Sequence, residues 1–110
     1  MDLDTVEWYM KIFHSGEACA TTSKELELMF GVRGAALRKV VNDLRRKGAP
    51  IASGENGYYY AETELELRRT IAHMKHRIAG ISAAIRGLEQ ALAHFDTTQL
   101  CLPLNGGDDA

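Results

Sequence analysis

The sequence predicts a mainly helical fold with one small β-hairpin and a long, heptad-patterned C-terminal helix. Three observations support this prediction. A glycine turn joins two short amphipathic segments between Thr22 and Lys47, and an Asn-Gly pair separates two β-prone runs between Pro50 and Ala61. Apolar residues then recur at heptad spacing from Leu67 to Phe95. With 110 residues, 45% of them apolar, the chain can form one small domain and one appended element.

The first helix is expected from Asp4 or Thr5 to Ser15, with Gly16 ending it. Asp4 is the expected N-cap, because Glu7 follows it at capping-box spacing. One face of this helix carries Val6, Tyr9, Met10 and Phe13, and a second apolar edge carries Trp8 and Ile12. A helix that is apolar on two sides should pack on its own domain and on a further surface. The loop that follows can add a short strand at Ala20-Thr21.

A helix, a glycine turn and a second helix are expected between Thr22 and Lys47. Thr22 and Glu25 have capping-box spacing, and Gly31 permits the left-handed backbone of a sharp turn. The apolar edge of the first helix consists of Leu26, Met29 and Phe30, and the buried stripe of the second consists of Leu37, Val40, Val41 and Leu44. This is the layout of a helix-turn-helix, whose second helix enters the major groove of DNA.

The second helix is strongly basic, whereas the chain as a whole is slightly acidic. From Arg33 to Lys47 there are six Lys or Arg residues and one acid, Asp43, which gives +5 in a chain of net charge −2. A basic helix on an otherwise acidic protein is the electrostatic pattern expected for contact with phosphate. The alternative is a solvated helix face without a ligand.

A two-stranded hairpin is expected directly after the basic helix. The runs Pro50–Ser53 and Tyr58–Ala61 are β-prone, and Asn56-Gly57 between them is a strong hairpin signal. Glu55 at the tip would be repelled by phosphate, so we expect little electrostatic affinity from this hairpin. Tyr59 or its neighbours should pack against the helices, and the alternative is a tyrosine hydroxyl that reaches a phosphate.

The run LRRKGAPIASGENGYYYA, from Leu44 to Ala61, follows the helix GVRGAALRKVV. Together they resemble the winged helix-turn-helix domain at the N-terminus of biotin-operon repressors. The resemblance covers residues 5–61, about half of the chain, and there is a looser likeness to small prophage-encoded winged-helix proteins with an appended long helix. It implies a winged helix-turn-helix domain over residues 1–61, with the hairpin as the wing. Glu27 departs from the pattern, because these families usually have a small residue there, where the two helices cross.

A single long helix is expected from Glu62 to Phe95, capped by Thr63 with Glu66 three residues later. Its strict 3.5-residue repeat and its length of roughly 48–50 Å suit a coiled coil better than a surface helix. The expected dimerisation residues are Leu67, Ile71, Met74, Ile78, Ile81, Ile85, Leu88 and Leu92, and Phe95 continues the seam. We therefore expect a homodimer through residues 63–95, and the alternative is packing within the chain. Arg68 and Glu89 slightly favour an antiparallel pair, but the orientation stays open.

Other classes of function find no support in the sequence. No phosphate-binding loop, catalytic triad or metal-ligand spacing is present, so we expect neither an enzyme nor a cofactor or metal site. Cys19 and Cys101 should be free thiols, and residues 96–110 should form a disordered tail. Without a signal sequence or an apolar run of membrane-spanning length, the protein should be cytoplasmic and should not contact a membrane.

Two functions fit these features. The first is a sequence-specific double-stranded DNA-binding protein, a transcriptional regulator that binds as a dimer with the 33–47 helix in the major groove. The residues expected to reach bases are Arg33, Arg38, Lys39 and Asn42, and those expected to hold phosphates are Lys24, Arg45, Arg46 and Lys47. The second is an assembly module that uses the same fold and the long helix, with weak or no DNA binding. The operator, the effector and the direction of regulation are not fixed by the sequence.

Overall fold

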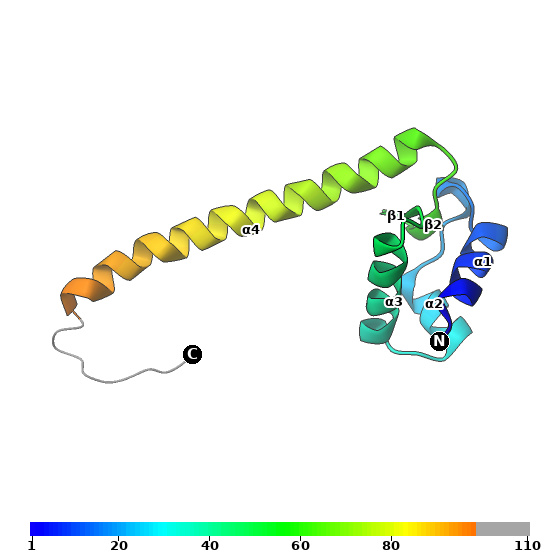
Figure 1. Cartoon of the computed structure of the whole chain (residues 1–110), viewed down its shortest axis with the longest axis horizontal. Helices are drawn as coiled ribbons and strands as arrows, with labels where there is room; N and C mark the ends of the chain where they lie inside the picture. The colour runs from blue at the N-terminus through cyan, green and yellow to red at the C-terminus, as the bar shows by residue number, and fades with distance from the viewer. Residues whose placement is uncertain (99–110) are drawn as a thin grey trace. The chain divides into compact units, whose positions relative to one another are not determined.

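The structure is a computed structural model that describes the backbone of residues 1–98 and the side chains of residues 1–95 (Figure 1). It confirms a mainly helical fold with one antiparallel hairpin and a long C-terminal helix. The chain divides into two compact units, Met1–His73 and a second one that begins at Met74. The elements are α1 (Leu3–Phe13), the 3₁₀ turn η1 (Glu17–Cys19), α2 (Ser23–Phe30), α3 (Gly34–Arg46), β1 (Ile51–Gly54), β2 (Gly57–Tyr60) and α4 (Glu64–Thr98).

The core of the first unit lies between α1, α2, α3 and the hairpin. The largest side chains that are almost fully buried in it come from every one of these elements: Val6, Met10, Leu26, Leu37, Leu44 and Ile51. Tyr59 is also almost fully buried, but it is not part of this core cluster. Removing this apolar surface from water is the main driving force for folding of so small a unit.

Helix α1 begins two residues earlier than expected, and its cap is Asp2 rather than Asp4. The Asp2 carboxylate accepts hydrogen bonds from the backbone N–H and the hydroxyl of Thr5, at 3.1 and 2.8 Å. Glu7 makes no capping box and instead accepts a 3.1 Å hydrogen bond from the Tyr60 hydroxyl. The helix ends at Phe13 and not at Ser15 as expected. Phe13 was expected on the buried face, but its side chain is 55% exposed. Trp8 and Ile12 are exposed, as a second apolar edge requires.

Helices α2 and α3 are joined by the tight turn that the sequence predicts. Thr22 and Glu25 form the expected capping box, in which each side chain accepts a hydrogen bond from the other residue's backbone N–H. Gly31 has φ +66° and ψ +39°, the left-handed conformation that ends α2. Leu26 is buried, but Met29 is 56% exposed, so the apolar edge of α2 is narrower than expected.

The hairpin pairs Ile51 with Tyr60 and Gly54 with Gly57, which leaves Glu55 and Asn56 as the two-residue loop. Each strand is shifted by one residue from the expected runs. The positive φ that the turn needs is supplied by Gly57 alone, at +112°. The third strand expected at Ala20-Thr21 does not form. Two isolated bridges, Ser15 with Tyr60 and Thr21 with Tyr58, connect the hairpin to the chain before α2.

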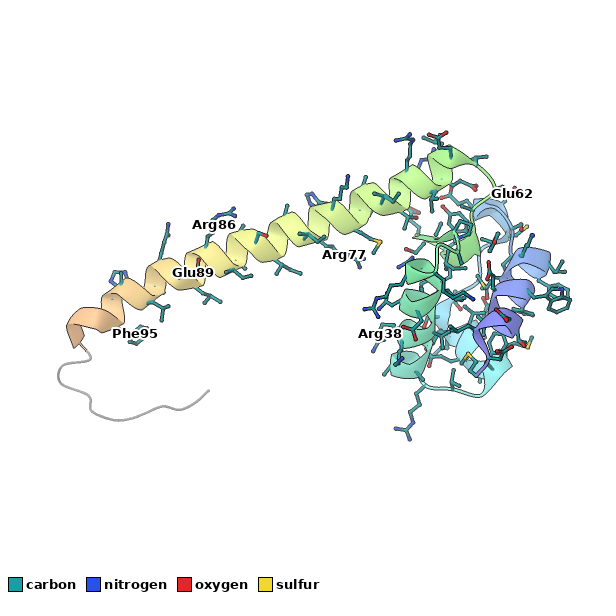
Figure 2. The ribbon with its side chains drawn as sticks, viewed as in Figure 1. Arg38, Glu62, Arg77, Arg86, Glu89 and Phe95 are labelled. Carbon is teal, nitrogen blue, oxygen red and sulfur yellow. The ribbon has the colours of Figure 1, made fainter. Side chains whose placement is uncertain are left out.

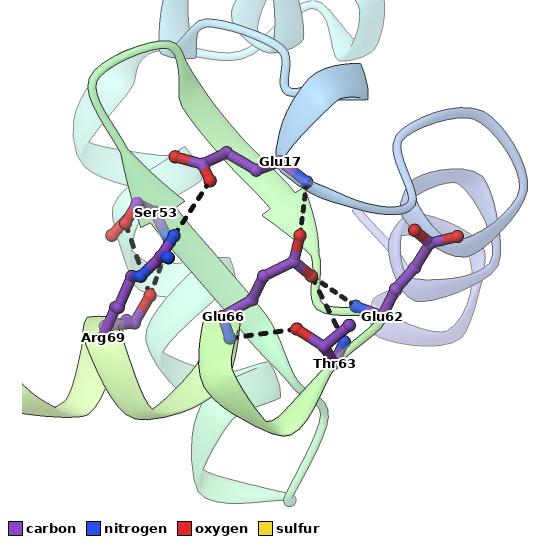
Figure 3. Close-up of polar contacts among 7 residues, drawn as sticks. Glu17, Ser53, Glu62, Thr63, Glu66 and Arg69 are labelled. Atoms are coloured by element: carbon purple, nitrogen blue, oxygen red, sulfur yellow. Dashed lines mark hydrogen bonds and ion pairs between the residues drawn. The ribbon is translucent and has the colours of Figure 1, made fainter.

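The first turns of α4 are fixed to the first unit by polar contacts (Figure 3). Thr63 and Glu66 form the expected capping box. The Glu66 carboxylate also accepts hydrogen bonds from the backbone N–H groups of Glu17, at 2.9 Å, and Glu62, at 2.8 Å. One turn later the buried Thr70 hydroxyl accepts a hydrogen bond from the Ser53 N–H and donates one to the Ser53 carbonyl. These contacts join the start of α4 to η1 and β1.

The Glu66 contacts predict a specific pH dependence of stability. The hydrogen bond from the Glu17 N–H, with those from Glu62 and Thr63, lowers the pKa of Glu66 below its usual value of 4.5. A depressed folded-state pKa stabilises the protein above pH 4.5, and this contribution is lost as the pH falls through the folded-state value. Glu66→Gln should therefore lower the free energy of unfolding at about pH 7, and the difference from the wild type should shrink as the pH falls below 4.5 toward about pH 3.

Urea unfolding at both pH values would measure this difference between the wild type and Glu66→Gln. Glu55→Gln is the matched control, because Glu55 is exposed at the hairpin tip and should behave as the wild type does. An equal effect of Glu66→Gln at both pH values would contradict the role given to these hydrogen bonds.

Along α4 the heptad seam lies on one continuous helix, as predicted. Leu67 and Met74 are half-buried, whereas the later seam residues are exposed by 44–70% of their surface: Ile71, Ile78, Ile81, Ile85, Leu88, Leu92 and Phe95. The disordered tail predicted from residue 96 was wrong for its first three residues, because α4 continues to Thr98. The remainder, residues 99–110 with Cys101, lies outside the described residues. In the described part of the chain, no helix is both long and apolar enough to cross a membrane.

Candidate nucleic-acid interface

Helix α3 turns one side to the core and the opposite side to solvent. Leu37, Val41 and Leu44 are buried, and Val40 is half-buried, so the predicted stripe faces the core. The residues expected to reach bases are all exposed: Arg33, Arg38, Lys39 and Asn42. Figure 2 shows Arg38 extending from α3. The structure thus brings the predicted base-contacting residues together on one accessible helix.

The N-terminal end of α3 is free of bulky side chains. Arg33 is the N-cap residue, and its side chain makes no capping hydrogen bond to the first turn. Gly34 and the exposed Ala35 and Ala36 follow it. The backbone N–H groups of this turn therefore have no side-chain cap, and the helix dipole adds positive potential there. The residues of the turn itself are small, although the Glu27 carboxylate and an Arg38 terminal nitrogen lie beside Gly34.

The crossing of α2 and α3 explains how Glu27 fits where a small residue is expected. The half-buried Glu27 carboxylate accepts a 2.9 Å hydrogen bond from the Ser23 hydroxyl. A Cβ at Gly34 would lie only 3.3 Å from Glu27 Oε2 and from an Arg38 terminal nitrogen. The small residue of this crossing therefore lies on α3 instead of α2. Gly34 was the signal in the sequence, but only the packing shows that it faces Glu27.

Three of the predicted cations make exposed ion pairs. Lys39 and Arg46 contact the two carboxylate oxygens of Asp43, at 2.9 and 3.5 Å, and Lys47 contacts Asp4 at 3.2 Å. The Lys39 and Arg46 side chains remain 77% and 80% exposed. Exposed pairs of this kind contribute about 0–1 kcal/mol, so a stronger anion such as phosphate can replace the carboxylate.

Lys24, Arg33 and Arg38 are exposed and make no ion pair within 4 Å among the described residues. Lys24 lies in the first turn of α2, and the two arginines lie at the start of α3 and one turn later. Their charges are therefore available to an external anion without loss of an internal contact.

Arg45 is placed differently from the other cations of α3. It is half-buried, and its Nε donates a 2.8 Å hydrogen bond to the Ile51 carbonyl. A terminal nitrogen also donates to the Ser53 hydroxyl at 3.3 Å. The guanidinium thus joins α3 to β1, which sequence reasoning missed. Its expected role in holding phosphate stays a prediction.

The hairpin offers little to an anion. Residues 51–60 contain no Lys or Arg, and Glu55 is exposed at the tip. Tyr59 is buried, and burial raises the pKa of its hydroxyl. The Tyr60 hydroxyl donates a hydrogen bond to Glu7. The pKa of Tyr60 is raised as well, mainly by burial and next by this hydrogen bond. Tyr58 and Tyr60 are half-buried and pack against the core, as expected for the neighbours of Tyr59.

Among the described residues, no group of three or more His, Cys, Asp or Glu side chains could hold a metal ion. Cys19, on η1, is exposed and free. No protein-family model, curated protein or solved structure matches the chain.

Proposed function

We propose that this protein is a sequence-specific double-stranded DNA-binding regulator of the winged helix-turn-helix class, acting in the cytoplasm as a dimer. In this proposal α3 enters the major groove, the hairpin is the wing, and α4 pairs with α4 of a second copy. The observation that carries the proposal is the exposed basic side of α3, with its residue types suited to base edges and phosphates.

The arrangement of side chains on α3 supports distinct roles within this contact. Arg38 and Asn42 lie one turn apart and are exposed, and these residue types make the bidentate contacts to guanine and adenine. Arg33 precedes the open N-terminal turn, where it would meet bases or the backbone at the groove edge. Lys24, Arg46 and Lys47 flank this surface and would hold phosphates, and Lys39 is close to the base-facing side.

Removing two charges from α3 should weaken DNA binding strongly. For Arg38→Ala/Lys39→Ala we expect about 10- to 100-fold weaker binding to random-sequence duplex DNA at low salt. The salt dependence should also become shallower by about two in log–log slope, because on random-sequence DNA these two cations would meet phosphates, and each lost phosphate contact releases about one counterion fewer. Fluorescence anisotropy at two or more salt concentrations would measure both quantities.

Lys11→Ala/Arg86→Ala is the matched control, since it removes the same charge from exposed positions on α1 and α4. This control should bind DNA within about two-fold of the wild type if the contact is local to α3. No binding by a folded wild-type protein at low salt would refute the proposal. Equal loss in both variants would show that net charge, and not the α3 surface, sets the affinity.

The second candidate is an assembly module with weak or no DNA binding. The exposed Glu55 and the cation-free hairpin favour it, because a wing of this kind adds no attraction for phosphate. The long exposed seam of α4 also fits it. The same titration separates the two, since the module would self-associate and fail to bind DNA.

A further inference from the structure

We propose that α4 pairs with α4 of a second copy in antiparallel orientation, in a register centred at Ala83 that sets Ile78 opposite the partner's Leu88. This inference rests on the dimer of the proposed function and is independent of whether α3 binds DNA. It fixes the partner, the direction and the register of the pairing, which the heptad pattern alone leaves open.

The exposed part of the seam sets the limits of the pairing. Leu67 is half-buried, and one residue before Ile71 the side chain of Thr70 is buried against Ser53. The seam side chains from Ile71, which is 44% exposed, as far as Phe95, which is 53% exposed, are accessible to solvent. The midpoint of the segment from Ile71 to Phe95 is Ala83, so an antiparallel pair centred there uses the whole open seam.

This register gives each seam residue of that segment an apolar partner. The layers are Ile71 with the partner's Phe95, Met74 with Leu92, Ile78 with Leu88 and Ile81 with Ile85, each repeated by the two-fold axis. A shift of one heptad in one direction places Glu64 opposite Phe95. A shift in the other direction places Met74 opposite Gln99 and Ile71 opposite residue 102, and both of these opposing positions lie outside the described residues. Apolar matching therefore selects the register centred at Ala83.

Charge complementarity selects the antiparallel direction. In the Ala83 register, Lys75 and Glu89 flank the seam at equivalent positions of the two helices and face each other across the pair, twice by symmetry. A parallel pair would instead set Thr70 near Lys75, Arg77 near Ser82 and Ala84 near Glu89. None of these is an ion pair. Lys75 and Glu89 are both exposed on α4, so their side chains are accessible to a partner. Figure 2 shows Glu89 on this helix.

The surface of α4 has a hollow of the right kind for the partner's side chains. It is lined by Ile85, Leu88, Glu89, Ala91, Leu92 and Phe95. These residues make two adjacent four-residue holes of a coiled coil. One consists of Ile85, Leu88, Glu89 and Leu92, and the other of Leu88, Ala91, Leu92 and Phe95. In the proposed register they receive the partner's Ile78 and Met74, respectively.

The small residues on the other flank fit the same arrangement. Ala84 lies opposite its own copy near the two-fold axis, and Ala91 lies opposite the partner's Arg77. Alanine at these positions lets the helices approach closely, and the aliphatic part of the Arg77 side chain can cover the seam. No like charges face each other on either flank.

A crosslinking experiment on the full chain tests the direction and the register. In a Cys19→Ser/Cys101→Ser background, Ser82→Cys places two thiols near the two-fold axis on the same flank of the pair. A short bismaleimide should convert most of this variant to covalent dimer. Leu92→Cys in the same background is the comparison, because its two copies meet in a parallel, in-register pair but lie about 27 Å apart in the proposed antiparallel pair. We expect its crosslinking to be at least ten-fold slower.

Charge reversal tests the register independently. Lys75→Glu and Glu89→Lys should each weaken the homodimer about ten-fold, because each variant sets like charges opposite each other at both ends. An equimolar mixture of the two variants should form heterodimers of about wild-type affinity, since every opposing pair is then attractive. Sedimentation equilibrium of the variants alone and mixed measures both effects.

Several outcomes would overturn the inference. They are faster crosslinking of Leu92→Cys than of Ser82→Cys, charge variants that fail to restore each other, and a wild type that is monomeric at all concentrations. If the crosslinking and charge-restoration results are as expected but the protein does not bind DNA, the proposed function is refuted and this pairing stands. If the protein binds DNA but does not dimerise, this pairing is refuted and the DNA-binding part of the proposed function stands.

Discussion

Gly57→Ala is expected to destabilise the first unit by about 3–5 kcal/mol, enough to unfold most of it. A Cβ at this position would lie 2.1 Å from the Thr21 carbonyl oxygen and 2.8 Å from the Thr22 Cα, both of which are backbone atoms. The backbone of Gly57 also has φ +112°, a conformation that L-residues rarely adopt. The hairpin and the chain entering α2 would have to separate, which breaks the bridge between Thr21 and Tyr58.

Gly31→Ala is the matched control for this substitution. Gly31 also has a positive φ, +66°, but a Cβ there would meet nothing within 4 Å. It should cost about 1 kcal/mol, the ordinary penalty of the left-handed conformation. Chemical denaturation followed by circular dichroism would compare the two. Equal losses would mean that backbone conformation alone, and not the contact with Thr21, makes Gly57 necessary.

Leu26→Ala should reduce the free energy of unfolding by about 2–5 kcal/mol. Leu26 is 2% exposed and is the fully buried residue of α2, so its truncation leaves a cavity beneath the helix pair. Because α2 supports α3, we also expect DNA binding to fall in proportion to the unfolded fraction. Urea denaturation measures the stability.

Leu28→Ala is the control, because it makes the same chemical change two residues along the same helix, where the side chain is 81% exposed. Its effect should stay within about 0.5 kcal/mol. A large loss from Leu28→Ala would show that Leu28 contacts a partner molecule or that the core lies elsewhere on α2.

The parts of the fold that were predicted correctly depend on local chemistry. The capping boxes at Thr22 and Thr63 and the turn at Gly31 each follow from residues within four positions of one another. The first cap was wrong because Asp2 and Asp4 are both suitable caps by spacing. Asp2 is favoured in the structure because Thr5 gives its carboxylate two hydrogen bonds. The shift of the strands likewise depends on bridges to Ser15 and Thr21, which the sequence of the hairpin does not contain.

The sequence was sufficient to predict which charged residues of the candidate interface are exposed. It was not sufficient to predict which other residues their side chains contact. Helical periodicity correctly separates Arg38 and Asn42 from the buried stripe. It does not show that Gly34 makes room for Glu27, since that contact joins two helices. Neither does it show that the Arg45 guanidinium turns back to Ile51, because long side chains at the edge of a helix can reach either solvent or a neighbouring strand.

The Arg45 contact has a consequence for any molecule that meets the first unit. Since Arg45 belongs to α3 and its guanidinium is bonded to Ile51 and Ser53, the helix and the hairpin are preorganised relative to each other. The Thr70 hydroxyl also binds Ser53, through the N–H and the carbonyl of that serine. The conformational entropy of ordering the hairpin has therefore been lost during folding. A ligand that contacts both α3 and the hairpin would therefore lose little affinity to the ordering of these elements.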